Sequence, residues 1–333
     1  MQVLLLDSYD AARVERLRGL IDPSWSIATS SHGAPEDELH ALLANAEAVV
    51  TQYWGERTPP APVLSLIQLP GAGFDAIDFA CVPAHSAVCN VFEHEIGIAE
   101  YVTLALLESE IRATEMDHHL RAGRWQDGFV TGAPFHGELH GKRVGFLGFG
   151  HIARATALRM KPFGVEIWTR TRTPEQAGPL AGNAGGLEAL DTMLEACHHI
   201  VVACPLTSET RGILDARRLA LIGPEGVLVN VARGPIVDEA ALFEALSSRT
   251  LGRAVIDTWY RYPDPTAGPG VERRPSRFPF HELDNVVMTS HASGWTDALF
   301  ERRYRMIAEN LERLRTGREL THVLKPPGGS APH

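Results

Sequence analysis

Short apolar runs alternate with segments of helical spacing along nearly the whole chain, and this alternation restricts the possible folds more than any other feature. The first series of apolar runs lies at 3–6, 48–51, 64–69 and 87–91. A second series lies at 144–147, 165–168, 200–203, 227–231, 254–256 and 286–289. Helix-length stretches between the runs lie at 11–20, 36–46, 152–161, 187–196 and 239–247. Strand–helix alternation of this kind produces parallel sheets with helices on both faces. We therefore predict an α/β fold with two doubly wound parallel-sheet domains.

The length of 333 residues also favours two domains over one. We predict a discontinuous, flavodoxin-like substrate domain formed by residues 1–98 and 297–324. Residues 99–296 are expected to form a dinucleotide-binding Rossmann domain. The Pro/Gly-rich end of the chain, 325–333, is predicted to be a flexible tail.

Three further segments carry expectations about the path of the chain. The apolar helix at 98–107 should lead from the first domain into the second. The helix at 297–316 has no apparent strand after it, and we expect it to cross back to the first domain. The segment 262–280, YPDPTAGPGVERRPSRFPF, is a long loop rich in Pro and Arg, and loops of this length inside compact domains are often functional.

The charge balance excludes broad classes of partner. A formal net charge of −10 argues against extended binding to nucleic acid or to an anionic membrane surface. No apolar stretch approaches the roughly 18 residues of a membrane span. The first residues, MQVLLLDSYD, are typical of a strand and not of a signal peptide. The cysteines lack C-x-x-C spacing, so we expect reduced thiols in a cytoplasmic protein. They are Cys81, Cys89, Cys197 and Cys204.

A glycine-rich loop follows the first strand of the second series. The segment KRVGFLGFG continues with His151, Ile152 and Ala153, and it fits the dinucleotide-binding pattern G-x-G-x-x-G/A. Gly148 permits the tight turn, Gly150 lets the backbone approach a pyrophosphate, and Ala153 allows the helix to pack closely on the strand. Because the pattern follows a strand and opens a helix, whose first N–H groups bind phosphate, we predict a dinucleotide site. The alternative is an ordinary glycine-rich turn.

The second strand of this series ends in 166-EIWTRTRTP-174. In NAD-binding chains a carboxylate about 20 residues after the glycine loop binds the ribose 2′-hydroxyl. Here Arg170, Thr171 and Arg172 occupy that place. An arginine can bond the 2′-phosphate of NADP, with charge-assisted hydrogen bonds worth about 1.5–3 kcal/mol each. We expect NADP as the preferred cofactor. The alternative is that both arginines are solvated and NAD binds.

Five segments together resemble the D-isomer-specific 2-hydroxyacid dehydrogenases. They are PGAGFDAID from residue 70, GFGHIA from 148, NVARGPIVDEAAL from 230, IDTWYRYP from 256 and MTSHASGWT from 288. The resemblance covers nearly the whole chain. It implies an NAD(P)-dependent enzyme that reduces a 2-oxo acid to a D-2-hydroxy acid in a cleft between two domains that closes on the substrate. It also implies a homodimer formed through the cofactor domain, with 116-MDHHLRAGRW-125 as the candidate contact.

The resemblance assigns a role to each matching residue. Arg233 should bind the substrate carboxylate and polarise the carbonyl, because a guanidinium grips two oxygens at once. His291 should act as the acid and base, since the ordinary pKa of imidazole, near 6.5, suits proton transfer at cellular pH. Asp257 should hold the nicotinamide end of the cofactor. The backbone N–H groups of Ala72 and Gly73 should receive the substrate carboxylate. Further cofactor-lining positions are Cys204, Pro205, Thr210, Val231 and Ala232.

One position departs from the family pattern. The family usually has a glutamate five residues after the aspartate, where it bonds the catalytic histidine and raises the pKa of its imidazole, but this chain has Tyr262. A neutral phenol can orient His291 but cannot stabilise an imidazolium as a carboxylate does, so we expect a less basic His291. The departure leaves open hydride removal without alcohol deprotonation, as in the formate and phosphite dehydrogenases that resemble this family. It also leaves open a dinucleotide-sensing protein similar to related corepressors, although the retention of both Arg233 and His291 favours an enzyme.

Other polar and aromatic residues fit two interpretations each. Glu93, His94 and Glu95 either reach a polar or cationic group of the substrate or form a solvated loop. Trp259 and Trp295 either line the cleft or pack against their neighbours. We predict no metal site, because the histidines lack a third ligand with suitable spacing.

Overall fold

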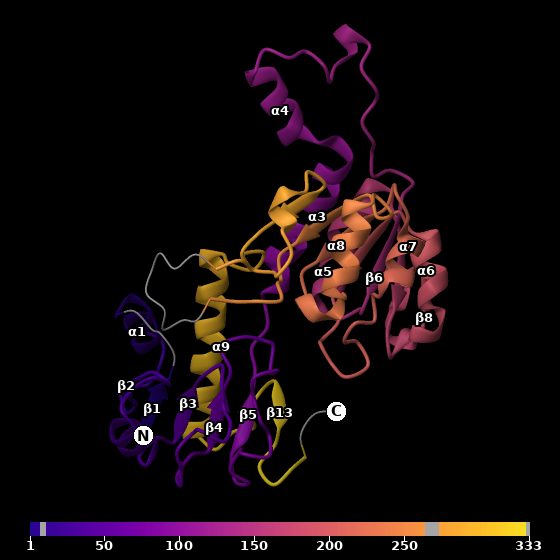
Figure 1. Cartoon of the computed structure of the whole chain (residues 1–333). Coiled ribbons are helices and arrows are strands. Elements are labelled where there is room, and N and C mark those ends of the chain that lie inside the picture. Colours follow the sequence, from indigo (N-terminus) through magenta and orange to yellow (C-terminus); the bar gives the residue numbers. More distant parts are fainter. Residues whose placement is uncertain (7–10, 264–272, 331–333) are drawn as a thin grey trace. The chain divides into compact units, whose positions relative to one another are not determined.

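The computed structural model describes residues 1–6, 11–263 and 273–330 (Figure 1). Contacts within the chain divide it into unit 1, which comprises Met1–Glu93 and Thr296–His333, and unit 2, which comprises His94–Trp295. Each unit contains one sheet of mainly parallel strands with helices on both faces. The predicted α/β class with two doubly wound sheets is therefore confirmed.

Unit 1 is built around a sheet with the strand order β13-β5-β4-β3-β1-β2. The strands are β1 (Gln2–Leu5), β2 (Ser26–Thr29), β3 (Ala48–Val50), β4 (Leu66–Gln68), β5 (Ala87–Cys89) and β13 (Val323–Lys325). The helices are α1 (Ala11–Arg18), α2 (Glu36–Leu43) and α9 (Asp297–Arg315). Successive residues of a strand point to opposite faces of its sheet. Val3 and Leu5 accordingly pack with buried residues of α1 and α9, whereas Leu4 packs with those of α2.

The last strand of unit 1 contradicts one expectation. We expected no strand after the closing helix, but β13 pairs antiparallel with β5. Lys325 ends this strand, and the flexibility of the tail at 325–333 otherwise stays a prediction. Lys325 is buried, and its Nζ donates to the carbonyl of Ser86 at 3.1 Å. Asn310 of α9 braces this region, since its Nδ2 donates to Oε1 of Gln68 at 2.8 Å. A strand of three residues is too short to show a periodic pattern, so these tertiary contacts decide its conformation.

Unit 2 contains a sheet with the order β12-β11-β10-β9-β6-β7-β8, in which all neighbouring strands are parallel. The strands are β6 (Arg143–Leu147), β7 (Glu166–Arg170), β8 (Asn183–Gly185), β9 (His199–Val202), β10 (Val227–Asn230), β11 (Arg253–Ile256) and β12 (Val286–Met288). The helices are α3 (Glu95–Ile111), α4 (Ala113–Arg121), α5 (His151–Met160), α6 (Leu190–Ala196), α7 (Ala216–Ile222) and α8 (Glu239–Ser247). Val144 and Phe146 of β6 face α3 and α5, whereas Leu147 faces the side covered by α6, α7 and α8.

Short 3₁₀ helices occur in the loops of unit 2. They are η1 (Phe129–Thr131), η2 (Lys161–Phe163), η3 (Pro174–Gln176), η4 (Gly178–Leu180), η5 (Leu187–Ala189), η6 (Gly234–Ile236) and η7 (Phe280–Glu282). Two predicted segments extend beyond the described residues, namely 264–272 of the predicted long loop and 331–333 of the predicted tail. Nowhere in 1–6, 11–263 or 273–330 is a helix long and apolar enough to cross a bilayer.

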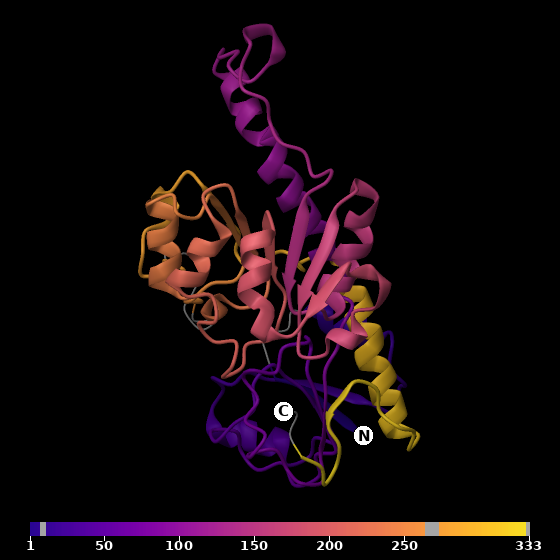
Figure 2. The same cartoon turned by 90° about the vertical axis from the view of Figure 1, so that its right-hand side faces the viewer.

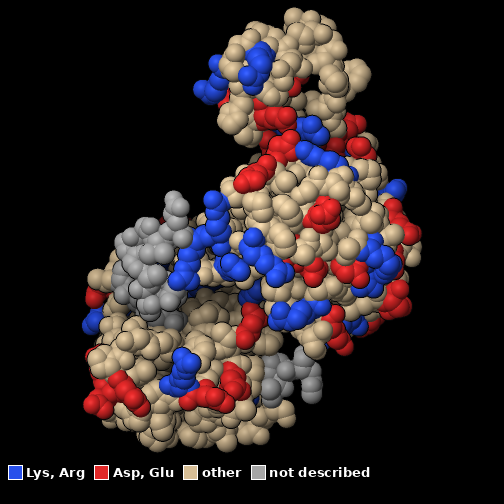
Figure 3. Space-filling view, in the orientation of Figure 1, with Lys and Arg blue, Asp and Glu red and all other residues tan. Residues whose placement is uncertain are grey.

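Helix α4 and the segment that follows it form an arm, residues 113–138, that extends away from the sheet of unit 2 (Figures 1 and 2). None of the α4 residues is buried. Three aromatic side chains of the arm are largely exposed, Trp125 at 64%, Phe129 at 97% and Phe135 at 102%. The surface of the arm is mostly uncharged (Figure 3). Exposed apolar patches of this kind mark contact surfaces for other molecules.

Candidate active site and cofactor pocket

Three predicted site residues follow three neighbouring strands of unit 2. Arg233 follows β10, Asp257 follows β11 and His291 follows β12, and these strands are adjacent and parallel. The carboxyl ends of parallel strands meet at one edge of a sheet, which is where doubly wound folds bind their ligands. The order of the strands therefore brings a guanidinium, a carboxylate and an imidazole to the same edge.

The Asp257 carboxylate holds the loop that carries His291. It is fully buried and accepts hydrogen bonds from Oγ1 of Thr289 at 2.6 Å, the N–H of Ala292 at 2.8 Å and the N–H of Ser293 at 3.1 Å. The backbone N–H of His291 also donates to the Asp257 carbonyl, at 2.8 Å. His291 has a φ of 59°, in the left-handed region that residues other than glycine seldom adopt. These hydrogen bonds of Asp257, which we call the clamp, thus maintain a left-handed conformation of His291 that costs about 1–3 kcal/mol.

Tyr262 lies against the imidazole of His291. Its hydroxyl is 3.0 Å from Nδ1 of His291 and accepts a hydrogen bond from the backbone N–H of Trp259 at 3.1 Å. Burial is the main cause that raises the pKa of Tyr262 above its ordinary value of 10.0, so the phenol is neutral at cellular pH. Tyr262 can therefore orient the imidazole through Nδ1, but it adds no negative charge beside the ring.

Two aromatic residues brace the same loop. The indole N–H of Trp259 donates to the carbonyl of Thr289 at 2.7 Å, and the Tyr101 hydroxyl lies 2.7 Å from Oγ1 of Thr289. Trp259 is buried and packs edge-on against Phe280, with 5.9 Å between the ring centroids. Of the two interpretations for Trp259, packing is the one that the structure shows. Trp295, in contrast, is 62% exposed.

The turn that carries Arg233 is fixed by Asn230 and Gly234. The buried Asn230 side chain donates to the carbonyl of Arg233 at 3.1 Å and accepts from the N–H of Ala232 at 3.1 Å. A Cβ on Gly234 would stand 2.5 Å from the carbonyl oxygen of Trp259, so glycine alone permits this approach of the two backbones. Sequence reasoning gave Asn230 and Gly234 no role, although both lie in the NVARGP segment.

The glycine loop joins β6 to α5. Gly148 has a φ of 89°, and a Cβ there would lie 2.8 Å from Cα of Cys204, so both conformation and close approach exclude a side chain. A Cβ on Gly150 would meet nothing within 4 Å, which leaves a bare backbone surface. The N-cap residue of α5, which begins at His151, is Gly150 itself, so it has no side chain that could cap the first turn. The open first turn and the bare surface fit the pyrophosphate of a dinucleotide.

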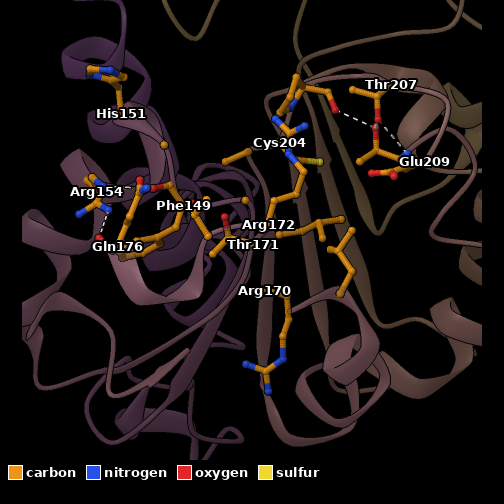
Figure 4. A pocket seen from close by; sticks show the side chains of 18 residues that line it. Phe149, His151, Arg154, Arg170, Thr171, Arg172, Gln176, Cys204, Thr207 and Glu209 are labelled. Atoms are coloured by element: carbon orange, nitrogen blue, oxygen red, sulfur yellow. Dashed lines mark hydrogen bonds between the residues drawn. The ribbon is translucent and has the colours of Figure 1, made fainter. Parts of the chain in front are cut away.

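A cavity of about 640 Å³ opens beside this loop (Figure 4). The predicted cofactor residues that line it are Gly148, Gly150, His151, Arg170, Thr171, Arg172, Cys204, Pro205 and Thr210. The lining residues that sequence reasoning missed include Phe149, Arg154, Gln176, Leu187, Thr207 and Glu209. The predicted cofactor residues outside this lining are Ile152, Ala153, Val231, Ala232 and Asp257. The volume lies within the range of small-molecule sites.

Two side chains, those of Arg154 and Thr210, hold the loops that line the cavity through hydrogen bonds that the sequence did not predict. Arg154 donates from Nε to the carbonyl of Phe149 at 3.1 Å, and its guanidinium lies 5.1 Å from the centroid of that ring. Thr210 donates from Oγ1 to the carbonyl of Pro205 at 2.7 Å and accepts from the N–H of Thr207 at 2.8 Å. Cys204 is inert there, because burial raises the pKa of its thiol to about 12.

The two arginines after β7 have different surroundings. Arg170 is 3% exposed, and its guanidinium donates to the carbonyl of Ala189, the carbonyl of Thr169 and Oδ1 of Asn183 at 2.7–3.0 Å. Figure 4 shows this side chain leading away from the other labelled residues. Arg172 is exposed, and in the described part of the chain its side chain forms no hydrogen bond or ion pair. The geometry leaves Arg172 as the candidate 2′-phosphate ligand, which corrects the expectation that both guanidinium groups face the cofactor.

In unit 1, two amide side chains hold the loop that was predicted to bind the substrate carboxylate. Asn90 donates to the carbonyl of Ala72 at 2.9 Å, and Gln52 donates to the carbonyl of Gly73 at 2.8 Å. No acceptor among the described residues takes up the N–H groups of Ala72 and Gly73. The carbonyls are thus anchored, and the N–H groups are the part of the loop that can receive a ligand.

The polar segment at residues 93–95 is not a solvated loop as a whole. Glu93 has a φ of 68° and forms an ion pair of 3.1 Å with Arg302 in α9. The side chains of His94 and Glu95 are only 14% and 17% exposed. A contact of these residues with a substrate stays a prediction.

The fold and these contacts define a class of protein, namely a two-domain oxidoreductase that binds a nicotinamide dinucleotide. Residues 103–293 match the family model described as D-isomer specific 2-hydroxyacid dehydrogenase, NAD binding domain. The chain is 30% identical over 318 residues to the glyoxylate reductase of Thermococcus onnurineus (strain NA1), covering 89% of this chain and 90% of the relative.

Two solved structures extend the comparison. The D-isomer specific 2-hydroxyacid dehydrogenase from Xanthobacter autotrophicus Py2, in complex with NADPH and MES, has a TM-score of 0.76 and 26% identity over 99% of each chain. A formate dehydrogenase from Granulicella M. shares the fold, with a TM-score of 0.80 and 22% identity over 100% of each chain. The chain belongs to the D-isomer-specific 2-hydroxyacid dehydrogenase family. It is an NAD(P)-dependent oxidoreductase that acts on CH–OH groups, which confirms the resemblance.

Proposed function

We propose that this chain reduces a 2-oxo acid to a D-2-hydroxy acid, with NADPH as the preferred reductant. The observation that carries the proposal is the meeting of Arg233, Asp257 and His291 at the carboxyl ends of three adjacent strands. A relative at 30% identity is named as a glyoxylate reductase, and glyoxylate is a 2-oxo acid.

In this proposal the substrate is held by its carboxylate and its keto oxygen. Arg233 donates to both, so it orients the acid and draws electron density from the carbonyl. The N–H groups of Ala72 and Gly73 bind the carboxylate as well. When bound, the reduced nicotinamide supplies the hydride for the carbonyl carbon. His291 delivers a proton from Nε2 to the keto oxygen, because Tyr262 engages Nδ1.

The preference for NADPH is assigned to Arg172. The end of β7 offers this exposed guanidinium where NAD-binding chains carry a carboxylate. A 26% identical enzyme of the family was solved with NADPH, which supports the assignment. Glu209 also lines the cavity, but it comes from a different loop.

A panel of 2-oxo acids tests the proposal. Each acid is incubated with NADPH or NADH, nucleotide oxidation is followed by absorbance, and the product is resolved by chiral chromatography. We expect a D-2-hydroxy acid, faster with NADPH, and loss of turnover in His291→Ala and Arg233→Ala. Binding of NADPH to each variant, measured by fluorescence, is the control for folding. If the wild type binds NADPH but turns over no acid in the panel, the proposal is wrong.

Hydride removal from formate or phosphite is the second candidate. The neutral Tyr262 beside His291 favours it, because neither reaction takes a proton from an alcohol. Formate and phosphite are therefore assayed with NADP and NAD in the same panel. Turnover of either anion in the absence of 2-oxo acid reduction would replace the first proposal.

We also propose that two copies associate through the arm. The exposed Trp125, Phe129 and Phe135 are apolar surface that a second copy would cover. Sedimentation of the wild type should give a dimer, and the double substitution Phe129→Ser and Phe135→Ser should shift it toward monomer. A wild type that sediments as a monomer at micromolar concentration contradicts this part.

A further inference from the structure

Arg154 of α5 bonds two loops that line the cofactor cavity. Its guanidinium donates from Nη1 to the carbonyl of Ala177 at 3.4 Å and from Nη2 to the carbonyl of Gln176. Its Nε donates to the carbonyl of Phe149, which lies between the two glycines of the loop after β6. Figure 4 shows the Arg154 side chain beside Gln176. One side chain thus joins the glycine loop to the loop that follows β7.

The loop after β7 is short and is held at both ends. At its start, the N–H of Thr171 donates to the carbonyl of Gly185 at 3.0 Å. At its end, Ala177 is buried in the core of unit 2 and carries one of the carbonyls bonded to Arg154. Between these two anchors lies η3, and the ring of its first residue, Pro174, fixes the backbone φ there.

Arg172, the proposed ligand of the 2′-phosphate, lies one residue after the first anchor. Its side chain is exposed and forms no hydrogen bond or ion pair within 1–6, 11–263 and 273–330. The position of its guanidinium therefore depends on the backbone that carries it. Release of the second anchor would give this backbone further conformations, and the entropy lost on ordering them again would weaken binding of a phosphate.

The contacts of Arg154 suit a group that holds loops more than a group that binds a ligand. Each of its three guanidinium nitrogens donates to a backbone carbonyl, and the guanidinium lies 5.1 Å from the centroid of the Phe149 ring. A planar guanidinium can span several acceptors at once because its N–H groups have a fixed geometry. Most of the capacity of Arg154 to donate hydrogen bonds is therefore used within the protein.

We propose that Arg154 is a positioning residue for the choice of cofactor, which holds Arg172 where a 2′-phosphate binds by bonding the glycine loop to the loop after β7. This inference rests on the proposed function, in which Arg172 sets the preference for NADPH. Loss of Arg154 should weaken binding of both nucleotides, because the Phe149 carbonyl belongs to the loop at the pyrophosphate. It should weaken binding of NADPH more, because only NADPH has a 2′-phosphate for Arg172 to meet.

Nucleotide binding without turnover tests the inference. Calorimetry gives the dissociation constants of NADPH and of NADH, and their ratio measures the preference for the 2′-phosphate. We expect this preference to fall about tenfold in Arg172→Ala and about fivefold in Arg154→Gln. The variant with both substitutions should match Arg172→Ala, because Arg154 acts through Arg172. Pro174→Gly, which loosens the loop but leaves both arginines in place, should also lower the preference.

Arg154→Lys and Arg159→Gln are the matched controls. The lysine keeps the positive charge but not the planar fork, so the preference should stay low, and a preference restored to that of the wild type would overturn the inference. Arg159 lies on the same helix outside the lining of the cavity, where it pairs with Glu100 at 3.8 Å. Arg159→Gln should leave the preference unchanged, and a fall equal to that in Arg154→Gln would mean that only net charge matters.

The double variant decides between positioning and direct contact. Losses that multiply when both arginines are removed would make Arg154 a phosphate ligand in its own right and would refute the inference. An equal loss for NADPH and NADH in Arg154→Gln would leave it only a structural role, with the same consequence. If Arg172→Ala responds but Arg154→Gln and Pro174→Gly do not, this inference alone fails. If Arg172→Ala itself leaves the preference unchanged, the proposed basis of the NADPH preference fails and the inference fails with it.

Discussion

The two arginines at the end of β7 allow a sharp test, because the same substitution should change different properties at each. Arg172→Ala removes an exposed guanidinium that lines the cofactor cavity. The bond that we propose between this guanidinium and a 2′-phosphate should lie at the lower end of the range for charge-assisted hydrogen bonds, about 1.5 kcal/mol, because solvent screens exposed charges. We therefore expect the ratio of kcat/KM for NADPH to that for NADH to fall about tenfold.

Arg170→Ala should reduce stability instead. The substitution leaves three acceptors without their donor, a buried one on Thr169 and partly buried ones on Ala189 and Asn183. We expect a loss of about 3 kcal/mol in the stability of unit 2, seen as a fall in Tm of about 6–12 °C. The ratio of kcat/KM for NADPH to that for NADH should change little in the molecules that remain folded, since this guanidinium is already bonded to three acceptors of the protein.

Both properties are measured on both variants. Steady-state kinetics with the two nucleotides gives the ratio, fluorescence titration gives the nucleotide affinities without turnover, and differential scanning calorimetry gives Tm. Arg172→Lys, which keeps the charge but not the planar fork, is the matched control and should fall between wild type and Arg172→Ala. A selective loss of NADPH use in Arg170→Ala, with an unchanged ratio in Arg172→Ala, would refute the reasoning.

Four further predictions concern the glycine loop and the loop of the catalytic histidine. Tyr262→Glu should raise the His291-linked apparent pKa in the pH–rate profile, because a carboxylate stabilises the imidazolium, and an unchanged profile would count against Tyr262 as its partner. The wild-type profile should show no ionisation of Tyr262 below pH 10, because burial raises the pKa of this phenol above its ordinary value of 10.0. Gly148→Ala should abolish nucleotide binding in a fluorescence titration, since the added Cβ would stand 2.8 Å from Cα of Cys204, and retained affinity would show that the loop can relax. Asp257→Ala should lower kcat more than a hundredfold, roughly 3 kcal/mol, by releasing the clamp on the loop, and a change confined to KM would contradict a positioning role.

The sequence predicted the order of the long elements because each buries a face or stripe of its own. The runs at 144–147 and 200–203 are apolar over their whole length, as strands covered on both faces must be, and they became β6 and β9. The strands β2, β8 and β13 were missed. Each is only three or four residues long and lies at or near a sheet edge, where few of its residues are buried. Their conformation depends on neighbours distant in the chain, which a local pattern does not record.

Supporting residues were harder to predict than the residues that face a ligand. Asn230, Trp259 and Arg154 act through hydrogen bonds to backbone groups far away or across a turn. An asparagine at the end of a strand, a tryptophan in a loop and an arginine in a helix are common residues at such places. Only the resemblance of the surrounding segments could have drawn attention to the first two, and no sequence signal indicated the third.

Arg170 and Asp257 show what separates a structural charge from one that meets a ligand. Both stand at the carboxyl end of a parallel strand, which is the position where charged residues of this fold bind ligands, and both were predicted to hold the cofactor. Each is buried and has protein partners for its charged group, the guanidinium on three acceptors and the carboxylate on three donors. A buried charge requires such partners, because desolvation is costly without them. Once those bonds are formed, the group fixes the shape of its loop and has little capacity left to bind a second molecule. Arg172 keeps that capacity because the described residues offer it no partner. We therefore propose it, and not Arg170, as the charge that meets the ligand.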